Sequence, residues 1–317
     1  MRSCSIALLP NAGLGNILFP WAHSRIFGAI NEIAACAIGW NRLRPGPLLR
    51  GERRMRYYGN SFKESKSAIA LSGLLSIKGT IVRNPNLERL DQRLRSDHLY
   101  VWDQIPHWSN YFGALKEYRD LVKELLWEAL TPSLRRQVIE APTPAVAVHI
   151  RRGDFRNLQL GEEFARVGST RTPLEYFIEL IHEIRRCCGF DVPVTVFTDG
   201  YASEIADVLA LPCVRLAERN RPIVDLLLMS RAQLLIVSAS STFGYWSGFL
   251  SGGPIILHPE HIHASLRPQS INDEYFEGAA VGSCDAWPSL LIRNIQNLRD
   301  EVITNESNGI FPAKMIV

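Results

Sequence analysis

The sequence predicts an α/β fold made of two halves, each with a parallel sheet, and a cleft between the halves. Short apolar runs, which are typical of buried strands, alternate with amphipathic helical stretches in both halves. A proline-rich segment at 141–144 separates them, and 317 residues are enough for two domains. We therefore place an N-terminal domain at 1–142 and a C-terminal domain at 143–317. Open sheets of this kind bind ligands beyond the carboxyl ends of their strands.

The N-terminal half opens with a βαβ pattern. Apolar runs at 5–9 and 33–38 predict two strands. The stretch between them predicts a helix over about 20–30, with Pro20 near its first turn. Further strands are expected at 68–75 and 99–102, a helix at 115–130, and a short helix that ends near Glu140.

The C-terminal half repeats the alternation with shorter connections. Strands are predicted at 145–149, 192–198, 214–216, 234–237 and 253–257. Helices are predicted at 174–187, 203–209, 223–230 and 243–250. A late helix over 288–299 is expected to fold back onto the N-terminal domain.

The composition excludes several classes of protein. Hydrophobic residues make up 46% and charged residues 21%, which is incompatible with wholesale disorder. A net charge of only +3 argues against a dedicated nucleic-acid binder. Six scattered cysteines without a CxxC pair predict reduced thiols rather than a disulfide scaffold or a zinc site. No apolar run is long enough to cross a membrane, so we expect a soluble, cytoplasmic protein without an integral membrane segment.

The strongest local signal is His149-Ile150-Arg151-Arg152-Gly153-Asp154, which directly follows a predicted buried strand. Two arginines at a strand end are costly to bury without anions. Since neighbouring side chains on extended backbone point to opposite faces, the two arginines should have different roles. One can bind a phosphate while the other pairs with Asp154 or a substrate group. A structural Arg–Asp pair at a surface turn is the competing interpretation.

Two more turns follow predicted strands and lead into helices. Gly13-Leu14-Gly15-Asn16 fits a phosphate-approach loop or a plain tight turn, and Asn16 could orient a sugar hydroxyl. Ser238-Ala239-Ser240-Ser241-Thr242 offers hydroxyls and free helix N–H groups to a phosphate. An ordinary N-cap by Ser241 or Thr242 is the competing interpretation. Asp225 is either another helix cap or a nucleoside-binding carboxylate.

These segments, taken in order, resemble the fucosyltransferase superfamily that shares an HxRRxD donor motif, and the bacterial α1,2-fucosyltransferases most of all. The family's GLGNQLFQYA is similar to the ten residues that start at Gly13, and its HIRRGD is reproduced in full from His149. Its STFSWW resembles the six residues that start at Ser241, and its GYWQSEKYF those that start at Asn110. The resemblance spans most of the chain in collinear order.

The resemblance implies a GT-B-like fold, with two Rossmann-like domains, and an enzyme that moves L-fucose from GDP-fucose to a glycan hydroxyl with inversion. It implies Arg152, Asn16 and Asp154 as candidate catalytic residues, with Arg152 on the diphosphate. It also implies a set of donor-binding residues: Gly13, Gly15, His149, Arg151, Arg152, Asp199, Asp225, Ser240, Ser241 and Thr242. No metal or other cofactor is expected, because no acidic metal-binding pair follows a strand.

The sequence departs from the family on the acceptor side. Ile17 and Pro20 stand where the family has glutamines, and no catalytic base carries over, so Asp154, Glu162 and Glu163 are only the nearest carboxylates. An arginine-rich run at 42–56 could face a polysaccharide or a lipid-linked oligosaccharide at a membrane surface, or could be a solvated basic face. The histidines at 258–263 suggest a solvated loop rather than a metal site. A transferase for another GDP-sugar and a non-catalytic GDP-sugar or glycan-binding protein are the alternatives.

Overall fold

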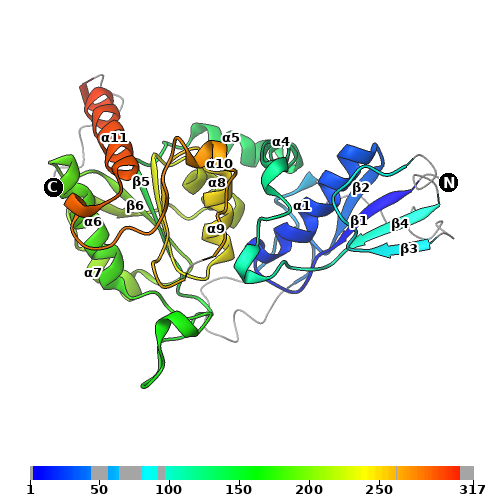
Figure 1. Cartoon of the computed structure of the whole chain (residues 1–317), viewed down its shortest axis with the longest axis horizontal. Helices are drawn as coiled ribbons and strands as arrows, with labels where there is room; N and C mark the ends of the chain where they lie inside the picture. The colour runs from blue at the N-terminus through cyan, green and yellow to red at the C-terminus, as the bar shows by residue number, and fades with distance from the viewer. Residues whose placement is uncertain (1–2, 44–55, 64–79, 92–96, 262, 308–317) are drawn as a thin grey trace. The chain divides into compact units, whose positions relative to one another are not determined.

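The computed structural model describes residues 3–43, 56–63, 80–91, 97–261 and 263–307, apart from the side chains of 305–307. The chain divides into two compact units, each with its own parallel sheet (Figure 1). The first unit comprises Met1–Gly46, Met55–Glu140 and His263–Leu266, and the second comprises Pro47–Arg54, Ala141–Ile262 and Arg267–Val317. Each unit is therefore an α/β layer structure of the Rossmann-like kind, as predicted.

The first unit is built on a four-stranded parallel sheet with the order β2-β1-β4-β3. Its strands are β1 (Cys4–Leu8), β2 (Ala34–Ile38), β3 (Thr80–Arg83) and β4 (His98–Trp102). Its helices are α1 (Leu14–Asn31), η3 (Trp108–Asn110), η4 (Lys116–Tyr118), α4 (Arg119–Ala129) and α5 (Pro132–Glu140). The predicted βαβ unit is thus β1, α1 and β2.

Helix α1 covers one face of this sheet. Phe27 of α1 packs against Tyr100 and Trp102 of β4, with ring centroids 4.7 and 5.4 Å apart. The Trp102 indole donates to the buried Ser5 hydroxyl of β1 over 2.9 Å, so the polar end of the ring is satisfied inside the core. These contacts fix α1 directly above the strand whose end carries the Gly13 turn.

The second unit is built on a six-stranded parallel sheet with the order β10-β9-β8-β5-β6-β7. Its strands are β5 (Val146–Ile150), β6 (Val194–Thr198), β7 (Val214–Leu216), β8 (Leu234–Val237), β9 (Ile255–Ile256) and β10 (Glu277–Gly278). Its helices are η5 (Phe164–Arg166), α6 (Leu174–Cys188), η6 (Ala202–Ile205), α7 (Ala206–Leu209), α8 (Pro222–Ser230), α9 (Thr242–Leu250), α10 (Gln269–Asn272), η7 (Cys284–Ala286) and α11 (Ser289–Ser307).

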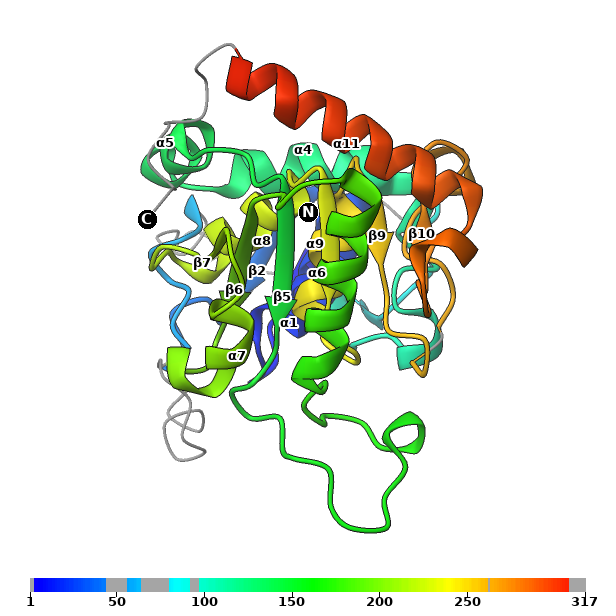
Figure 2. The same cartoon turned by 90° about the vertical axis from the view of Figure 1, so that its left-hand side faces the viewer.

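Helices cover both faces of this sheet, so β5 and β8 are buried along their whole length. Figure 2 shows α6 and α11 in front of the sheet and α8 and α9 behind it. A buried apolar strand run without polar alternation is what a parallel sheet covered on both faces requires.

Helix α11 belongs to the second unit. It packs against α6, and its apolar side chains Leu291, Ile295 and Leu298 are part of the core of that unit. The expected packing of this helix on the N-terminal domain stays a prediction. The apolar spacing of α11 matches the face of α6 that it covers, which is why it is held within its own unit.

Other differences concern element ends. Helix α1 begins at Leu14, so Pro20 lies inside the helix and not in its first turn. Strand β3 was not predicted, and the strand expected at 68–75 lies outside the described residues. None of the six cysteines, which all lie within the described residues, forms a disulfide. Within the described ranges, no helix combines the length and apolar character that a membrane span needs.

Candidate functional site

The carboxyl edge of the second sheet gathers most of the predicted site residues. The chain runs from β5 to β6 and β7 on one side and then returns to β8 on the other side of β5. The edge between β5 and β8 is therefore a topological switch point, where open α/β sheets form ligand crevices. Arg151 follows β5 and Ser238 follows β8, and the Arg151 N–H donates to the Ser238 hydroxyl over 2.8 Å.

Arg151 is held by two carboxylates. Its guanidinium forms ion pairs with Asp154 and with Asp199, which follows β6. The guanidinium stacks 5.2 Å from the centre of the Phe155 ring. Because two acids already neutralise Arg151, it ties the ends of β5 and β6 together. The predicted Arg–Asp154 pair is present, and it involves the first of the two arginines.

Arg152 points into a different environment, as the alternation of extended backbone predicts. Its side chain is only 6% exposed, and its Nη1 donates to the Thr172 carbonyl over 3.1 Å. Its Nε is buried without a hydrogen-bond partner among the described residues. Burial and the charge of nearby Arg171 lower the pKa of Arg152 below its ordinary value. A buried guanidinium with unused donors is suited to an anion.

Because Gly200 has no side chain, Arg152 can pack closely against its backbone. A β-carbon at position 200 would lie 2.6 Å from the Arg152 β-carbon and 2.7 Å from a carboxylate oxygen of Glu204. Glu204 in turn pairs with Arg171, with 2.9 Å between the charged atoms. The Thr198-Asp199-Gly200 turn therefore serves both arginines, because Asp199 accepts from the Arg152 N–H over 2.9 Å and pairs with Arg151.

His149 is a neutral, buried histidine. Its side chain is 3% exposed, and burial lowers its pKa to about 4. Its Nδ1 finds no hydrogen-bond partner among the described residues. A β-carbon at Gly244 would lie 2.8 Å from that nitrogen, so α9 approaches the ring closely only because residue 244 is glycine. His149 therefore packs against the start of α9, and its expected part in donor binding stays a prediction.

The turn from β8 to α9 presents the remaining hydroxyls. Ser240 adopts a left-handed backbone with a φ of 56°, and its N–H donates to the Tyr245 hydroxyl over 2.8 Å. Ser241 occupies the N-cap position of α9, yet its side chain makes no capping hydrogen bond. The capping interpretation of Ser241 is therefore wrong, and the first N–H groups of α9 lack a side-chain cap. Thr242 is the first residue of the helix.

Thr172 joins this turn to Arg152. Its hydroxyl accepts from the Ala239 N–H over 3.1 Å while its carbonyl accepts from the Arg152 guanidinium. A single residue therefore holds the guanidinium and the start of α9 at one place. Together they form a positively polarised surface at the switch point.

Asp225 lies in the first turn of α8, whose N-cap is Arg221, so Asp225 is not the capping residue. Its carboxylate accepts from the Asn220 side chain over 3.0 Å. The structure removes the capping interpretation and leaves the nucleoside-binding role as a prediction.

The first unit carries Gly13, Gly15 and Asn16 at the carboxyl end of β1. Gly13 is the N-cap of α1 and supplies no side-chain cap. The Oδ1 atom of Asn16 is buried without a partner among the described residues. Because Pro20 lacks an N–H, it cannot donate to the backbone carbonyl of Asn16, four residues earlier in the helix.

Arg56, in the arginine-rich run, lies near the Gly13 turn: a β-carbon at Gly13 would lie 3.4 Å from the Arg56 guanidinium. Arg44, Arg50, Arg53 and Arg54 of the arginine-rich run lie outside the described residues.

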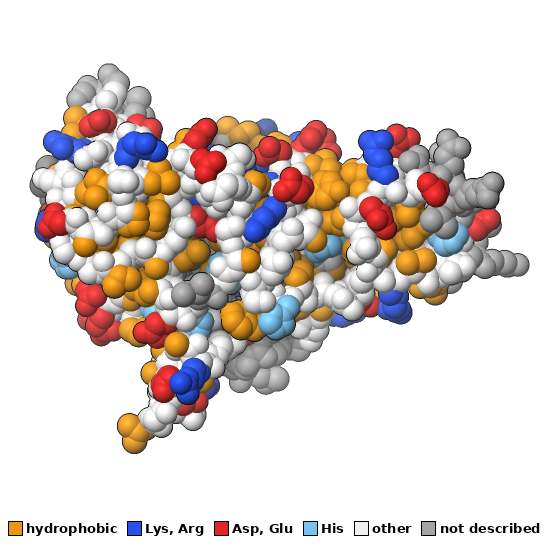
Figure 3. Space-filling model, in the orientation of Figure 1, with side chains coloured by type: hydrophobic (Ala, Val, Ile, Leu, Met, Phe, Trp, Pro, Cys, Tyr) orange, Lys and Arg blue, Asp and Glu red, His pale blue; other side chains and the backbone are white. Residues whose placement is uncertain are grey.

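None of the three nearest carboxylates stands out as a base. Asp154 pairs with Arg151. Both oxygens of Glu162 accept from Arg156, over 2.6 and 2.7 Å, and this pairing lowers the pKa of Glu162. Glu163 pairs with Arg166 over 2.8 Å. The long β5–α6 loop that carries these two glutamates projects from the second unit, with charged and hydrophobic side chains on its surface (Figure 3).

The histidine segment after β9 differs from the expected solvated loop. His258 is 9% exposed, and its ring centre lies 4.8 Å from that of Phe164 and 4.5 Å from that of Tyr176. Burial, helped by nearby His261, lowers the pKa of His258 to about 4. Among the residues that the structure describes, no cluster of three or more His, Cys, Asp or Glu side chains could hold a metal ion.

Sequence reasoning missed Arg171 and Thr172. Each is a single polar residue without a local motif, and each acquires its role through a tertiary contact. Both precede α6, and no signal in the sequence pointed to them. Ser238 was expected to offer its hydroxyl to a phosphate, whereas that hydroxyl accepts from the Arg151 N–H and donates to the His149 carbonyl.

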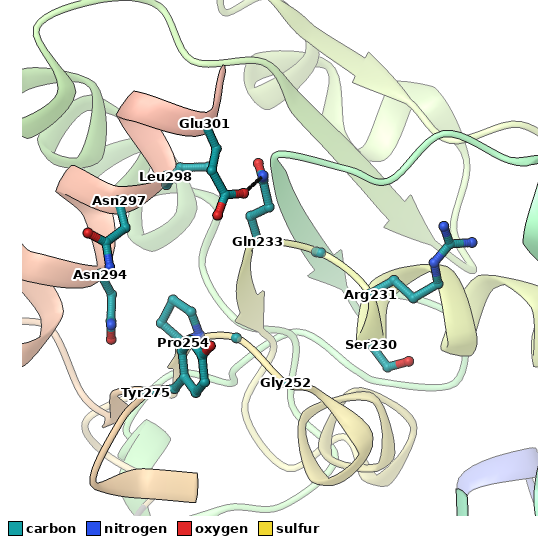
Figure 4. A pocket seen from close by; sticks show the side chains of 12 residues that line it. Ser230, Arg231, Gln233, Gly252, Pro254, Tyr275, Asn294, Asn297, Leu298 and Glu301 are labelled. Carbon is teal, nitrogen blue, oxygen red and sulfur yellow. Dashed lines mark hydrogen bonds between the residues drawn. The ribbon is translucent and has the colours of Figure 1, made fainter. Parts of the chain in front are cut away.

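A separate cavity of about 390 Å³ opens at the opposite, amino edge of the second sheet (Figure 4). Its lining comes from the segments that lead into β8 and β9 and from α11, and Gln233 donates to Glu301 across it. Because the predicted site residues lie at the carboxyl edge, this cavity is distinct from the candidate site.

Comparison with known proteins gives one family and several distant structures. The model of glycosyl transferase family 11 matches residues 83–275, more than half of the 317 residues. No curated protein matches the chain.

Three solved structures illustrate the similarity. Fucosyltransferase NodZ from Bradyrhizobium is 12% identical, with a TM-score of 0.48 over 81% of this chain and 97% of that chain. A mutant of Arabidopsis thaliana FUT1 in complex with GDP is 11% identical, with a TM-score of 0.42 over 84% and 73%. POFUT1 in complex with GDP is 13% identical, with a TM-score of 0.42 over 81% and 98%. At these values nothing about the chemistry of this chain follows from the likeness.

Proposed function

The chain belongs to glycosyl transferase family 11, and from that premise we propose that it transfers L-fucose from GDP-β-L-fucose to a glycan hydroxyl. The transfer proceeds with inversion, forms an α1,2 linkage and needs no metal. The fucosyl donor and the linkage rest on the resemblance of the His149–Asp154 motif and the Gly13 and Ser241 segments to the bacterial α1,2-fucosyltransferases.

The observation that carries this proposal is the group of hydrogen-bond donors at the switch point, formed by Arg152 and the start of α9. Arg152 is buried without a described partner for its Nε, Arg171 and its partner Glu204 lie nearby, and the Ser241 side chain does not cap α9. A diphosphate can accept hydrogen bonds from these donors. Arg152 and the α9 N–H groups bind the diphosphate, and Ser240, Ser241 and Thr242 add hydroxyl contacts.

The same groups assist the reaction. Negative charge grows on the departing diphosphate as the sugar–oxygen bond breaks, and fixed donors stabilise that charge without reorganisation. Arg151 keeps the β5 and β6 ends in register through Asp154 and Asp199. In the first unit, Asn16 has a buried acceptor without a described partner, and we assign it to a sugar hydroxyl. The acceptor is a polysaccharide or a lipid-linked oligosaccharide.

We place the reaction in the cytoplasm. Six free cysteines support a reducing compartment.

Calorimetric titration with GDP, GDP-fucose, GDP-mannose and UDP, with and without EDTA, tests the donor. We expect GDP and GDP-fucose to bind, UDP not to bind, and EDTA to change nothing. If EDTA abolished binding and Mg²⁺ or Mn²⁺ restored it, the metal-independent mechanism would be wrong.

A glycan array with labelled GDP-fucose, together with a donor-hydrolysis assay, tests the reaction. We expect label on glycans with a free 2-hydroxyl. Binding without turnover would indicate a glycan-binding protein, and turnover of GDP-mannose alone would indicate a different transferase.

A further inference from the structure

Ser240, His261 and Phe164 form a chain of hydrogen bonds beside the start of α9. The Ser240 hydroxyl lies 2.8 Å from His261 Nδ1, and His261 Nε2 lies 3.0 Å from the Phe164 carbonyl oxygen. Three separate segments meet here: the β8–α9 turn, the loop after β9 and the β5–α6 loop. Ser240 is held in the left-handed region, which a non-glycine residue adopts at a cost when the surroundings enforce it.

The Phe164 carbonyl fixes the proton on one nitrogen of the ring. A carbonyl oxygen can only accept, so Nε2 of His261 must carry hydrogen and donate to it. In the neutral ring Nδ1 is then an acceptor, and the Ser240 hydroxyl donates its only proton to it. With neutral His261, Ser240 therefore offers a ligand lone pairs and no proton.

Protonation of His261 reverses this bond. The charged ring donates from Nδ1, the Ser240 oxygen accepts, and the Ser240 proton is free to turn toward a ligand. A positive charge also appears beside the uncapped start of α9. Both changes favour an anion at this position.

The titratable groups around this pair come from three elements. His258, on the same loop, has its ring centre 6.1 Å from that of His261, and Tyr176 of α6 packs on His258. Tyr245 of α9 accepts from the Ser240 N–H. Burial keeps His258 neutral down to a pH of about 4, and burial raises the pKa of Tyr176, so neither changes charge near neutral pH.

We propose that His261 is a positioning residue that takes up one proton when the donor diphosphate binds and thereby turns the Ser240 hydroxyl toward a phosphate oxygen. The proton comes from solvent, resides on Nδ1 while the nucleotide is bound, and returns to solvent when the nucleotide leaves. This inference rests on the proposed function, because it requires the diphosphate to lie at the start of α9.

Calorimetry of the wild-type protein with GDP-fucose tests the proton directly. GDP-fucose is the right probe because its two phosphates have no group that titrates near neutral pH, whereas the terminal phosphate of GDP does. Titrations in two buffers of different ionisation enthalpy report proton uptake. We expect net uptake that approaches one proton at pH values where His261 of the free protein is neutral, and an affinity that falls by about tenfold per pH unit there.

Three variants assign that proton. His261→Phe keeps a ring against Phe164 without a nitrogen, and His261→Asn keeps an amide within reach of Ser240 that cannot titrate. Both should bind GDP-fucose without proton uptake, and their affinity should not change with pH in the range where the wild-type affinity falls. His182→Gln, at an exposed position on α6, should keep the full wild-type uptake.

The outcomes separate the two proposals. Failure of GDP-fucose to bind at any pH would refute the proposed function and this inference with it. Tight binding without proton uptake, or uptake that survives in His261→Phe, would overturn the role of His261 alone.

Discussion

Replacement of Arg152 by lysine keeps the positive charge and removes the planar guanidinium with its several N–H donors. Arg152 uses Nη1 on the Thr172 carbonyl, and its Nε has no partner among the described residues. A lysine has one nitrogen, which would have to serve the carbonyl and the diphosphate together, and the site is only 6% exposed, so water cannot make up the loss.

The structure sets the size of the expected effect. A hydrogen bond to a charged group is worth about 1.5–3 kcal/mol, which corresponds to GDP binding that is roughly 10- to 150-fold weaker. If the contact strengthens as the diphosphate leaves, kcat/KM for GDP-fucose should fall further, by about 2–4 kcal/mol in total or roughly 30- to 1000-fold. Loss of the bond to Thr172 should lower the free energy of unfolding by about 1 kcal/mol.

Calorimetry with GDP, turnover of GDP-fucose and thermal unfolding should be measured on the same preparation. Arg185→Lys is the matched control, because Arg185 is also 6% exposed and donates to the backbone carbonyls of Val192 and Pro212. These two residues precede β6 and β7, so the contacts lie at the edge of the sheet opposite the candidate site. We expect Arg185→Lys to lose stability and keep its GDP affinity. A folded Arg152→Lys protein with wild-type affinity and turnover would refute the assignment of the diphosphate to Arg152.

Three further predictions concern the same edge of the sheet. Asp225→Ala should weaken GDP binding with little change in thermal stability, and unchanged affinity by calorimetry would remove Asp225 from the nucleotide site. Gly200→Ala should displace Arg152 or Glu204, lower the free energy of unfolding by about 1–3 kcal/mol and weaken GDP binding, as chemical unfolding and calorimetry would show. A variant as stable as the wild type would show that the turn adjusts freely. Burial lowers the pKa of His149 to about 4, so the unfolded chain binds the proton more readily. The stability that neutral His149 contributes is therefore complete above about pH 6.5 and is lost as the pH falls through 4, by on the order of 3 kcal/mol. In urea unfolding, a folded His149→Gln variant should lose less of its free energy of unfolding than the wild type over that pH window.

Strong local patterns made much of the fold predictable. The strands that became β5 and β8 are continuous apolar runs with turn residues at their ends, and the structure buries both completely. Strand β3 was missed because three of its four side chains are exposed, so it carries no apolar pattern. The start of α1 was missed because a proline usually marks a first turn, whereas Pro20 sits inside this helix.

The candidate site was predictable only where residues stand next to one another in sequence. The motif at His149–Asp154 and the Asp199 turn could be found because each follows a strand directly. That Arg151 takes both carboxylates while Arg152 stays available is a tertiary result. No spacing within the sequence distinguishes the two arginines, because Asp199 follows β6 and Thr172 precedes α6, far from both in the sequence.

The place of α11 in the core has a consequence for the order in which the protein can fold during synthesis. The first sheet is complete once residue 102 has been made, because β1 to β4 all lie before that point. The apolar face of α6, with Phe177 and Ile184, belongs to the same core as Leu298 and Val302 of α11. On a translating ribosome that core cannot be completed until α11 emerges. The nascent second unit is therefore the part of this chain that chaperones would be expected to hold.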